Sequence, residues 1–170
     1  MKGYIQIYTG NGKGKTTAAL GLSLRAAGAG KKVFIGQFIK GMPYSELELV
    51  AQLPGVTLKQ YGRGCFIEQE PTRADYAAAE KGLDELRAVL KSGDYDVVIL
   101  DEANVALYFG LISFKQLEKA LLERAEHVEV ILTGRYAPQE LIDLADLVTE
   151  MREVKHYYQQ GVEARFGIEK

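Results

Sequence analysis

A glycine-rich segment near the start of the chain, T-G-N-G-K-G-K-T-T at residues 9–17, has the residue types of a phosphate-binding loop. It ends on Gly14-Lys15-Thr16, as does the pattern G-x-x-x-x-G-K-[ST], with Thr9 at the position of the first glycine. In such a loop the glycines let backbone N–H groups point inward, the lysine charge reaches the phosphates, and the hydroxyl can bind Mg²⁺. We therefore predict a nucleotide phosphate site; the alternative is a glycine-rich turn that binds nothing.

A pair of carboxylates follows an apolar run later in the chain. Residues 97–100 are continuously apolar, as expected of a strand buried on both faces, and Asp101 and Glu102 come directly after them. In nucleotide-binding folds such a strand ends beside the phosphate loop and presents a carboxylate to Mg²⁺, directly or through water. We predict that Thr16, Asp101 and Glu102 hold Mg²⁺ or Mn²⁺; the alternative is a solvated strand end that carries acids by chance.

An arginine ends the next apolar run. Thr133-Gly134-Arg135 follows a strand predicted at residues 128–133, so Arg135 is expected at the same edge of the sheet as the carboxylates. An arginine there can contact phosphate or stack on a base. A surface ion pair is the alternative.

The elements that must position these residues alternate along the sequence. Helical patterns lie at residues 15–29, after Pro71 in the position of a first helical residue, and after the S-x-x-Q capping box of Ser113 and Gln116. Strands are predicted at residues 5–8, 33–38, 56–61, 97–100, 128–133 and 147–151. This alternation predicts an α/β fold, namely a single-domain P-loop (RecA-like) parallel sheet with helices on both faces, over residues 1–170.

Two stretches fit no predicted element. Residues 40–46 and 61–70 are irregular in pattern, and each follows a predicted strand. Because ligands of open α/β sheets bind outside the carboxyl ends of the strands, both stretches are candidates for substrate contact. Simple connection between elements is the alternative.

Composition narrows the class of protein. Of the 170 residues, 47% are hydrophobic and 26% charged, which is the balance of a globular chain rather than a disordered one. The net charge of −2 argues against nucleic acid as a partner. Cys65 is the only cysteine, so an internal disulfide is impossible, and no apolar run approaches the length of a membrane span. We expect a cytoplasmic protein.

A series of motifs occurs in one order along the chain: residues 9–17, Q-F-I-K-G at 37–41, Asp101-Glu102, T-G-R at 133–135 with Ala137-Pro138, A-D-L-V-T-E-M at 145–151, Lys155-His156 and A-R-F-G-I-E at 164–169. This order resembles that of the P-loop type of ATP:corrinoid adenosyltransferase, the cob(I)alamin adenosyltransferase family. The resemblance extends over nearly the whole chain, and Thr9 at the first position of the loop belongs to the family pattern.

The resemblance implies the reaction and its substrates. A reduced cobalt(I) corrinoid, such as cob(I)alamin, attacks C5′ of ATP, and inorganic triphosphate leaves, in the biosynthesis or salvage of adenosylcobalamin. It also implies Mg²⁺ dependence, a homodimer and a flavin-type protein as reductant, with no role for nucleic acid or membrane. Lys15, Thr16 and Glu102 are the implied catalytic residues.

Binding residues are also implied by position. The nucleotide-binding set is Thr9, Gly10, Asn11, Gly12, Lys13, Gly14, Lys15, Thr16, Thr17, Arg25, Arg135 and His156. Alternatives stay open for Arg25, as a solvated helix charge, and for His156, as a surface histidine. Many relatives carry G-x-G-F-T-W after the third strand to cover the corrin. The corresponding residues here are Gly62, Gly64, Cys65, Phe66 and Ile67, with Cys65 at the Phe position and Ile67 at the Trp position.

Two other functions compete with adenosyl transfer. A phosphate loop is equally compatible with a nucleoside kinase or an ATPase that transfers or hydrolyses the γ-phosphate, in which Glu102 would serve as base. A binding module that is gated by nucleotide, with no turnover, is the third possibility.

Overall fold

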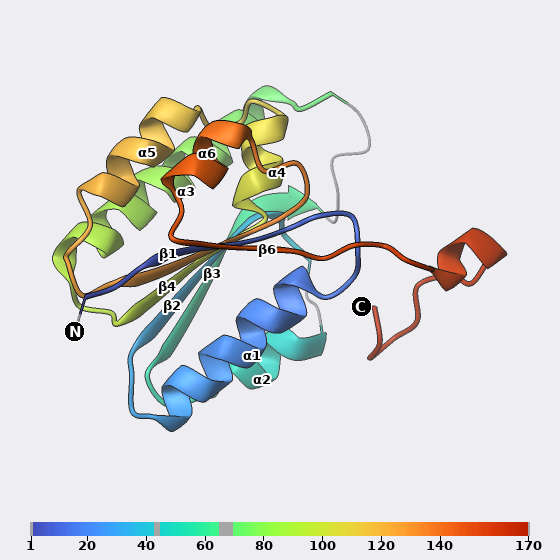
Figure 1. Cartoon of the computed structure of the whole chain (residues 1–170), viewed down its shortest axis with the longest axis horizontal. Helices are drawn as coiled ribbons and strands as arrows, with labels where there is room; N and C mark the ends of the chain where they lie inside the picture. The colour runs from blue at the N-terminus through green and yellow to red at the C-terminus, as the bar shows by residue number, and fades with distance from the viewer. Residues whose placement is uncertain (1, 43–44, 65–69, 170) are drawn as a thin grey trace.

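The computed structural model describes residues 2–42, 45–64 and 70–169. Its centre is a six-stranded sheet in which every pairing is parallel. The strand order is β3-β2-β4-β5-β1-β6 (Figure 1). The strands are β1 (Ile5–Thr9), β2 (Val33–Lys40), β3 (Val56–Gly64), β4 (Val97–Asp101), β5 (Glu129–Thr133) and β6 (Leu147–Glu150). The predicted α/β class with a parallel sheet is confirmed.

Helices cover both faces of this sheet, as predicted. α1 (Lys15–Gly28) and α2 (Ser45–Ala51) lie on one face. The other face carries α3 (Arg73–Ser92), α4 (Ala103–Tyr108), α5 (Phe114–Leu122) and α6 (Gln139–Leu144) (Figure 1). The phosphate loop connects β1 to α1, and β4 leads directly into α4. The phosphate loop and the carboxylate pair Asp101-Glu102 therefore leave the sheet at the same edge.

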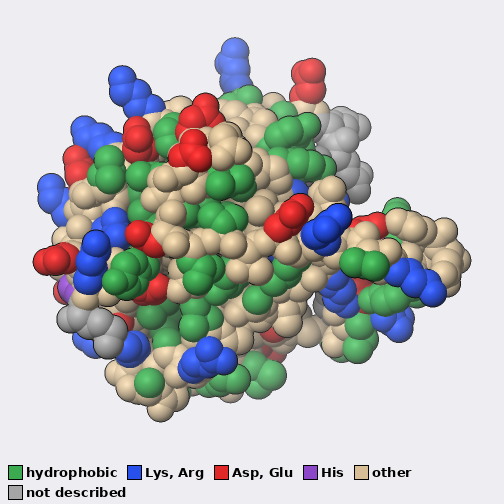
Figure 2. All heavy atoms as spheres, in the orientation of Figure 1, with side chains coloured by type: hydrophobic (Ala, Val, Ile, Leu, Met, Phe, Trp, Pro, Cys, Tyr) green, Lys and Arg blue, Asp and Glu red, His purple; other side chains and the backbone are tan. Residues whose placement is uncertain are grey.

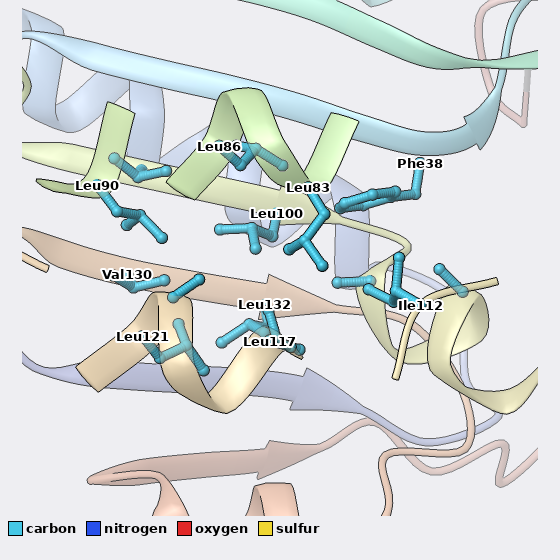
Figure 3. Close-up of a cluster of buried hydrophobic side chains, with 14 of the residues drawn as sticks. Phe38, Leu83, Leu86, Leu90, Leu100, Ile112, Leu117, Leu121, Val130 and Leu132 are labelled. Atoms are coloured by element: carbon cyan, nitrogen blue, oxygen red, sulfur yellow. The ribbon is translucent and has the colours of Figure 1, made fainter. Parts of the chain in front are cut away.

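The larger apolar core lies between the sheet and α3 with α5 (Figure 3). On α3, Ala79, Leu83, Leu86 and Leu90 form one apolar stripe, and all four are buried. They meet side chains of the central strand β4, which is buried along its whole length. A smaller core packs α1 onto the opposite face. Because both faces of the central strands are covered, the ends of these strands are held firmly where the site residues lie.

Helix starts confirm one prediction and correct another. The Ser113–Gln116 capping box is present, since the Ser113 amide donates to the Gln116 side chain at 3.1 Å and the Gln116 amide to the Ser113 hydroxyl at 3.3 Å. Pro71, in contrast, is not the first residue of its helix. Thr72 is the N-cap and forms a capping box with Asp75, so α3 begins at Arg73.

Three short helices were absent from the sequence-based prediction. α2, α4 and α6 have six or seven residues each, too few to establish a helical period. As a result, the prediction that residues 40–46 are irregular is wrong at both ends, because Lys40 belongs to β2 and α2 begins at Ser45. The stretch 61–70 is likewise strand as far as Gly64.

The last residues leave the main body of the molecule. After β6 the chain forms a separate lobe that contains the 3₁₀ helix η1 (Tyr157–Gln160). Figure 2 shows Lys and Arg side chains on this lobe and at its junction with the main body. Over the described residues, the structure contains no helix with the length and apolarity needed to cross a membrane.

Candidate active site

The carboxyl ends of the strands open into a cavity of about 1100 Å³. The phosphate loop forms its floor, and α1, α2, α4, the loop after β5 and the C-terminal lobe supply the walls. This is the edge at which open parallel sheets bind ligands. Of the predicted loop residues, those that line the cavity are Asn11, Gly12, Lys13, Gly14, Lys15, Thr16 and Thr17.

The phosphate loop is held in part by the segment that follows β6. Gly10 and Gly14 have φ of 94° and 113°, a conformation that favours glycine. The Gly12 amide donates to the Met151 carbonyl oxygen at 2.7 Å, so it does not join the inward-pointing anion nest that the sequence predicts. Thr9 is also turned away from the cavity, because its hydroxyl accepts a hydrogen bond from the backbone after β5.

Lys15 is folded back onto its own loop. Its ammonium donates to the carbonyl oxygens of Gly10 at 2.7 Å and Gly12 at 2.8 Å. Burial lowers the Lys15 pKa, and the positive charges of Arg135 and Lys40 lower it further. Three cations therefore lie close together in one cavity, an arrangement that a polyanion would relieve.

Asp101 is the centre of the polar network behind the loop. The residue is 1% exposed, and each of its carboxylate oxygens accepts two hydrogen bonds. Oδ1 accepts from the hydroxyls of Thr16 at 2.9 Å and Thr133 at 2.6 Å. Oδ2 accepts from the Gln37 amide at 3.1 Å and the Lys40 ammonium at 2.9 Å. One buried carboxylate of β4 thereby ties together α1, β2 and β5 at the site.

Glu102 faces the cavity from a strained backbone position. It is the N-cap of α4 and has φ of 58°, which is uncommon for a residue with a side chain. Its amide donates to the Thr133 hydroxyl at 3.1 Å, and its carboxylate lies 3.8 Å from the Lys40 ammonium. Burial raises the Glu102 pKa, and the nearby Asp101 charge raises it further.

A bulge in β2 directs Lys40 toward Asp101. The pairing of β2 with β3 shifts between Phe38 and Lys40, and the intervening Ile39 has φ of 66°. A β-bulge of this kind redirects the side chain that follows it. Gly62 permits the bulge, because a Cβ at that position would lie 2.0 Å from the Ile39 carbonyl oxygen.

The more distant predicted nucleotide contacts divide into two groups. Arg135 and His156 both line the cavity, and the His156 ring accepts a hydrogen bond from the Tyr158 amide at 3.1 Å. Arg25 lies ten residues beyond Lys15 on α1, about 15 Å along the helix, and is not among the residues that line the cavity. Its phosphate contact stays a prediction.

Lys13 joins the phosphate loop to the C-terminal lobe. Its ammonium lies 2.7 Å from the Glu169 carboxylate, 3.0 Å from the Ile168 carbonyl oxygen and 3.2 Å from the Tyr157 hydroxyl. Glu169 also pairs with Arg165 at 3.2 Å. Lys13 was predicted to bind nucleotide; here its charge is already used to hold the lobe over the cavity.

The predicted corrinoid-binding segment lies largely outside the described residues. Cys65, Phe66 and Ile67 fall within residues 65–69, which the structure does not describe. Gly62 and Gly64 end β3, and neither lines the cavity at the phosphate loop. Gly62 has instead the structural task described above.

Comparison with known proteins gives a consistent result. Residues 1–169 match the family model described as ATP:corrinoid adenosyltransferase BtuR/CobO/CobP. The chain is 38% identical to the corrinoid adenosyltransferase of Escherichia coli (strain K12) over 169 residues, which cover 99% of this chain and 86% of that protein. It is 39% identical to the corrinoid adenosyltransferase CobA of Salmonella typhimurium, with the same coverage. A corrinoid adenosyltransferase of Sinorhizobium sp is 38% identical over 99% of this chain and 80% of its own length.

This chain belongs to the ATP:corrinoid adenosyltransferase family. The family is one of transferases whose substrates are ATP and a corrinoid, so the resemblance found from the motifs is confirmed. A kinase or ATPase that acts on the γ-phosphate is not favoured.

Oxygen atoms of the kind that bind a cation lie together beside the phosphate loop. Thr16 and Asp101 already surround a cation, since the Lys40 ammonium lies 3.1 Å from the Thr16 hydroxyl and 2.9 Å from the carboxylate. Among the described residues, no cluster of three or more His, Cys, Asp or Glu side chains could hold a metal ion. Mg²⁺ in nucleotide enzymes commonly takes one or two protein carboxylates and completes its shell with phosphates and water.

Four polar residues of the site have no role in the prediction from sequence. Gln37 and Lys40 lie in the Q-F-I-K-G segment, and Thr133 precedes Gly134 and Arg135. Gln37 and Thr133 stand at the ends of predicted strands, and Lys40 begins the stretch 40–46 that was named as a candidate for substrate contact, so a usable signal existed for each. Asn104, whose side-chain amide donates to the Gly134 carbonyl oxygen at 2.9 Å, had no such signal because α4 was not predicted.

Proposed function

We propose that this protein transfers the 5′-deoxyadenosyl group of ATP to the cobalt(I) ion of a reduced corrinoid and releases inorganic triphosphate. One observation carries the proposal from the structural side. Lys15, Lys40 and Arg135 line the same cavity as the phosphate loop, so positive charge is concentrated where a triphosphate would depart.

The bonds that form and break in adenosyl transfer explain why cations at the triphosphate promote the reaction. The cobalt(I) electron pair forms the bond to C5′ of ATP, the C5′–O bond breaks, and its electrons leave on the triphosphate. Preorganised cations and N–H groups that stabilise this developing charge lower the barrier directly. Lys15 is the principal group in this role, once the triphosphate replaces the loop carbonyls that it now contacts.

Adenosyl transfer needs no protein base. No proton is removed in the reaction, since the nucleophile is the cobalt(I) ion of the substrate. Glu102 is therefore proposed as a metal-binding carboxylate rather than as a base. Its place beside Lys40 and Asp101, in a cluster of opposite charges, supports that role.

Thr16 and Asp101, with Glu102, are the residues proposed to hold Mg²⁺ or Mn²⁺. A divalent ion bound with ATP supplies additional positive charge to the phosphate oxygens. The hydrogen bond between the Thr16 hydroxyl and Asp101 brings these two proposed ligands together before any metal arrives.

An apolar wall faces the phosphate loop across the cavity. It is formed by apolar side chains of α1, of α2 and of the turn after α2: Leu20, Leu24, Leu49, Val50 and Leu53. A site that joins a charged nucleotide to a largely apolar macrocycle needs both kinds of surface. We propose that this wall packs against the parts of the two substrates that carry no phosphate.

We also propose a homodimer and a flavin-type protein reductant in the cytoplasm. For the dimer, β6 is an edge strand with all four residues exposed, and the C-terminal lobe exposes Val154 and Phe166 at 93% and 85%. Exposed edges and apolar side chains of this kind are typical of protein interfaces. Light scattering of the purified protein would show one mass near 37.6 kDa, twice 18.8 kDa, if the dimer forms.

The activity is tested by anaerobic incubation with ATP, Mg²⁺ and chemically reduced cob(I)alamin, followed by the corrin absorption spectrum. We expect conversion to an alkylated cobalt species that depends on both ATP and protein. If ATP binds but the corrin spectrum never changes, the protein is a binding module and the proposal is wrong. Formation of ADP or orthophosphate without an adenosyl corrinoid would instead indicate a kinase or an ATPase.

A further inference from the structure

We propose that Lys40 is an internal cation that occupies the metal-binding oxygens while no nucleotide is bound, and that it leaves them when metal and ATP arrive together. This rests on the proposed function, in which Thr16 and Asp101 hold a divalent ion. Lys40 is thus a positioning residue, and its effect is to make metal binding depend on nucleotide.

The contacts of Lys40 are those expected of a bound ion. Its ammonium lies 2.9 Å from one oxygen of Asp101, 3.1 Å from the Thr16 hydroxyl and 3.8 Å from the Glu102 carboxylate. These are the three residues that the sequence predicts as metal ligands. The residue is 8% exposed, so the ammonium is largely shielded from water.

The backbone is built to deliver this side chain. Lys40 follows the bulge of β2, where Ile39 adopts φ of 66°. A β-branched residue rarely adopts this conformation, and strain of this kind persists only where the surrounding structure enforces it. Gly62 on β3 allows the close approach of the Ile39 carbonyl, because any larger residue would overlap it. The backbone therefore directs Lys40 toward these oxygens while no ligand is bound.

The Lys40 ammonium balances the charge of two neighbouring carboxylates. Asp101 is buried and the adjacent Glu102 is only partly exposed, so without a cation the mutual repulsion of the two carboxylates would disturb the site. The ammonium offsets that repulsion in the absence of ligand. A divalent ion at the same oxygens would be repelled by the ammonium at close range. Only an ion accompanied by triphosphate brings enough negative charge to accommodate the ammonium elsewhere in the cavity.

The test measures Mn²⁺ binding by the electron paramagnetic resonance signal of the free ion, with and without ATP. Wild-type protein should bind Mn²⁺ weakly alone and tightly with ATP. Lys40→Met should bind Mn²⁺ without ATP roughly tenfold more tightly than wild type or better, because the competing charge is gone. Lys59→Met is the matched control, since it removes the same charge from the neighbouring strand β3, where Lys59 pairs with Glu85.

Two further measurements keep the proposal open to refutation if Lys40→Met folds poorly. Lys40→Arg retains a cation and should bind Mn²⁺ without ATP as weakly as wild type. A crystal structure of wild-type protein with Mn²⁺ and a non-reacting ATP analogue should show the Lys40 ammonium withdrawn from Asp101. Tight binding by Lys40→Arg, or an ammonium still on Asp101 beside the metal, would overturn the proposal.

The outcomes separate this inference from the proposed function. If wild type binds Mn²⁺ with ATP but Lys40→Met shows no gain without it, Lys40 does not compete with the metal, and the proposed function stands. If no variant binds Mn²⁺ even with ATP, the metal site of the proposed function is wrong, and the inference about Lys40 is overturned with it.

Discussion

One carboxylate determines where the polar residues of the site lie. The described side chains that donate to Asp101 come from the phosphate-loop helix and from two neighbouring strands: Thr16, Gln37, Lys40 and Thr133. Both oxygens of the Asp101 carboxylate therefore have hydrogen-bond donors, as buried polar groups generally do. The position of Thr16 at the mouth of the phosphate loop is therefore set by β4, far away in the sequence.

Lys15→Ala tests the leading residue of the proposed chemistry. We expect kcat/KM for adenosyl transfer to fall by about 10²–10³-fold, since loss of one preorganised donor to a developing negative charge has effects of that size. Lys32→Ala, which removes an exposed lysine before β2, is the control and should leave the rate unchanged. Near-normal turnover by Lys15→Ala, with ATP still bound, would contradict the role of Lys15.

At the scale of elements, the end of β2 is shaped by the neighbouring strand β3. A Cβ atom at Gly62 would overlap the Ile39 carbonyl group, whereas a Cβ atom at Gly64 would meet nothing within 4 Å. Both glycines were predicted to contact the corrinoid. The structure gives Gly62 a different explanation, which does not involve a ligand.

Gly62→Ala and Gly64→Ala therefore form a matched pair. We expect Gly62→Ala to lower the melting temperature and, like Lys40→Met, to bind Mn²⁺ more tightly without ATP, because the β2 bulge must shift and displace Lys40. Gly64→Ala should fold like wild type. The measurements are thermal unfolding and Mn²⁺ binding. Equal stability of the two variants would show that the close approach at Gly62 does not constrain the bulge.

The C-terminal lobe is held to the phosphate loop by charge. Hydrogen bonds from Arg165 and then from Lys13 hold the pKa of Glu169 well below its usual range. A lowered carboxyl pKa means that the ionised form stabilises the lobe above the ordinary glutamate pKa of about 4.3, and that this contribution is lost as the pH falls from there. Because the group is at the surface, salt should weaken the contact.

Glu169→Gln is expected to loosen the lobe without unfolding the protein. Backbone amides of residues 165–169 should exchange hydrogen a few-fold faster than in wild type at pH 7, as for a surface ion pair. Wild-type protein should approach the same rate in high salt, after correction for intrinsic exchange. Glu163→Gln, in the same exposed segment, is the control. Unchanged exchange in Glu169→Gln would mean that other contacts hold the lobe.

Periodicity and motif order predicted most of the fold, but not all of the site. The buried strands and α3 have patterns long enough to recognise, and the residue series at 9–17, 101–102 and 133–135 each contribute residues that line the cavity. The bulge at Ile39 could not be foreseen, because it depends on a contact with Gly62 that is non-local. Without the bulge, Lys40 has no reason to point at Asp101. The engagement of Lys13 by the lobe is also non-local, whereas the helices α2, α4 and α6 escaped prediction because they are too short to establish a helical period.

At the scale of the whole molecule, two kinds of surface meet in one cavity. Cations and the phosphate loop lie at the strand ends, while leucines of α1 and α2 form the facing wall. The arrangement suits a reaction that parts a triphosphate from a nucleoside and delivers the nucleoside to an apolar macrocycle. Membership of the ATP:corrinoid adenosyltransferase family agrees with that division.

Adenosyl transfer is tested by the product balance of a single anaerobic reaction with reduced cob(I)alamin and ATP labelled in both the adenine and the γ-phosphate. We predict that the adenine label moves to the corrinoid and that the γ-phosphate label is recovered as inorganic triphosphate, in equal amounts. Recovery of the γ-phosphate label as orthophosphate or on another acceptor, with the adenine label left in ADP, would contradict adenosyl transfer.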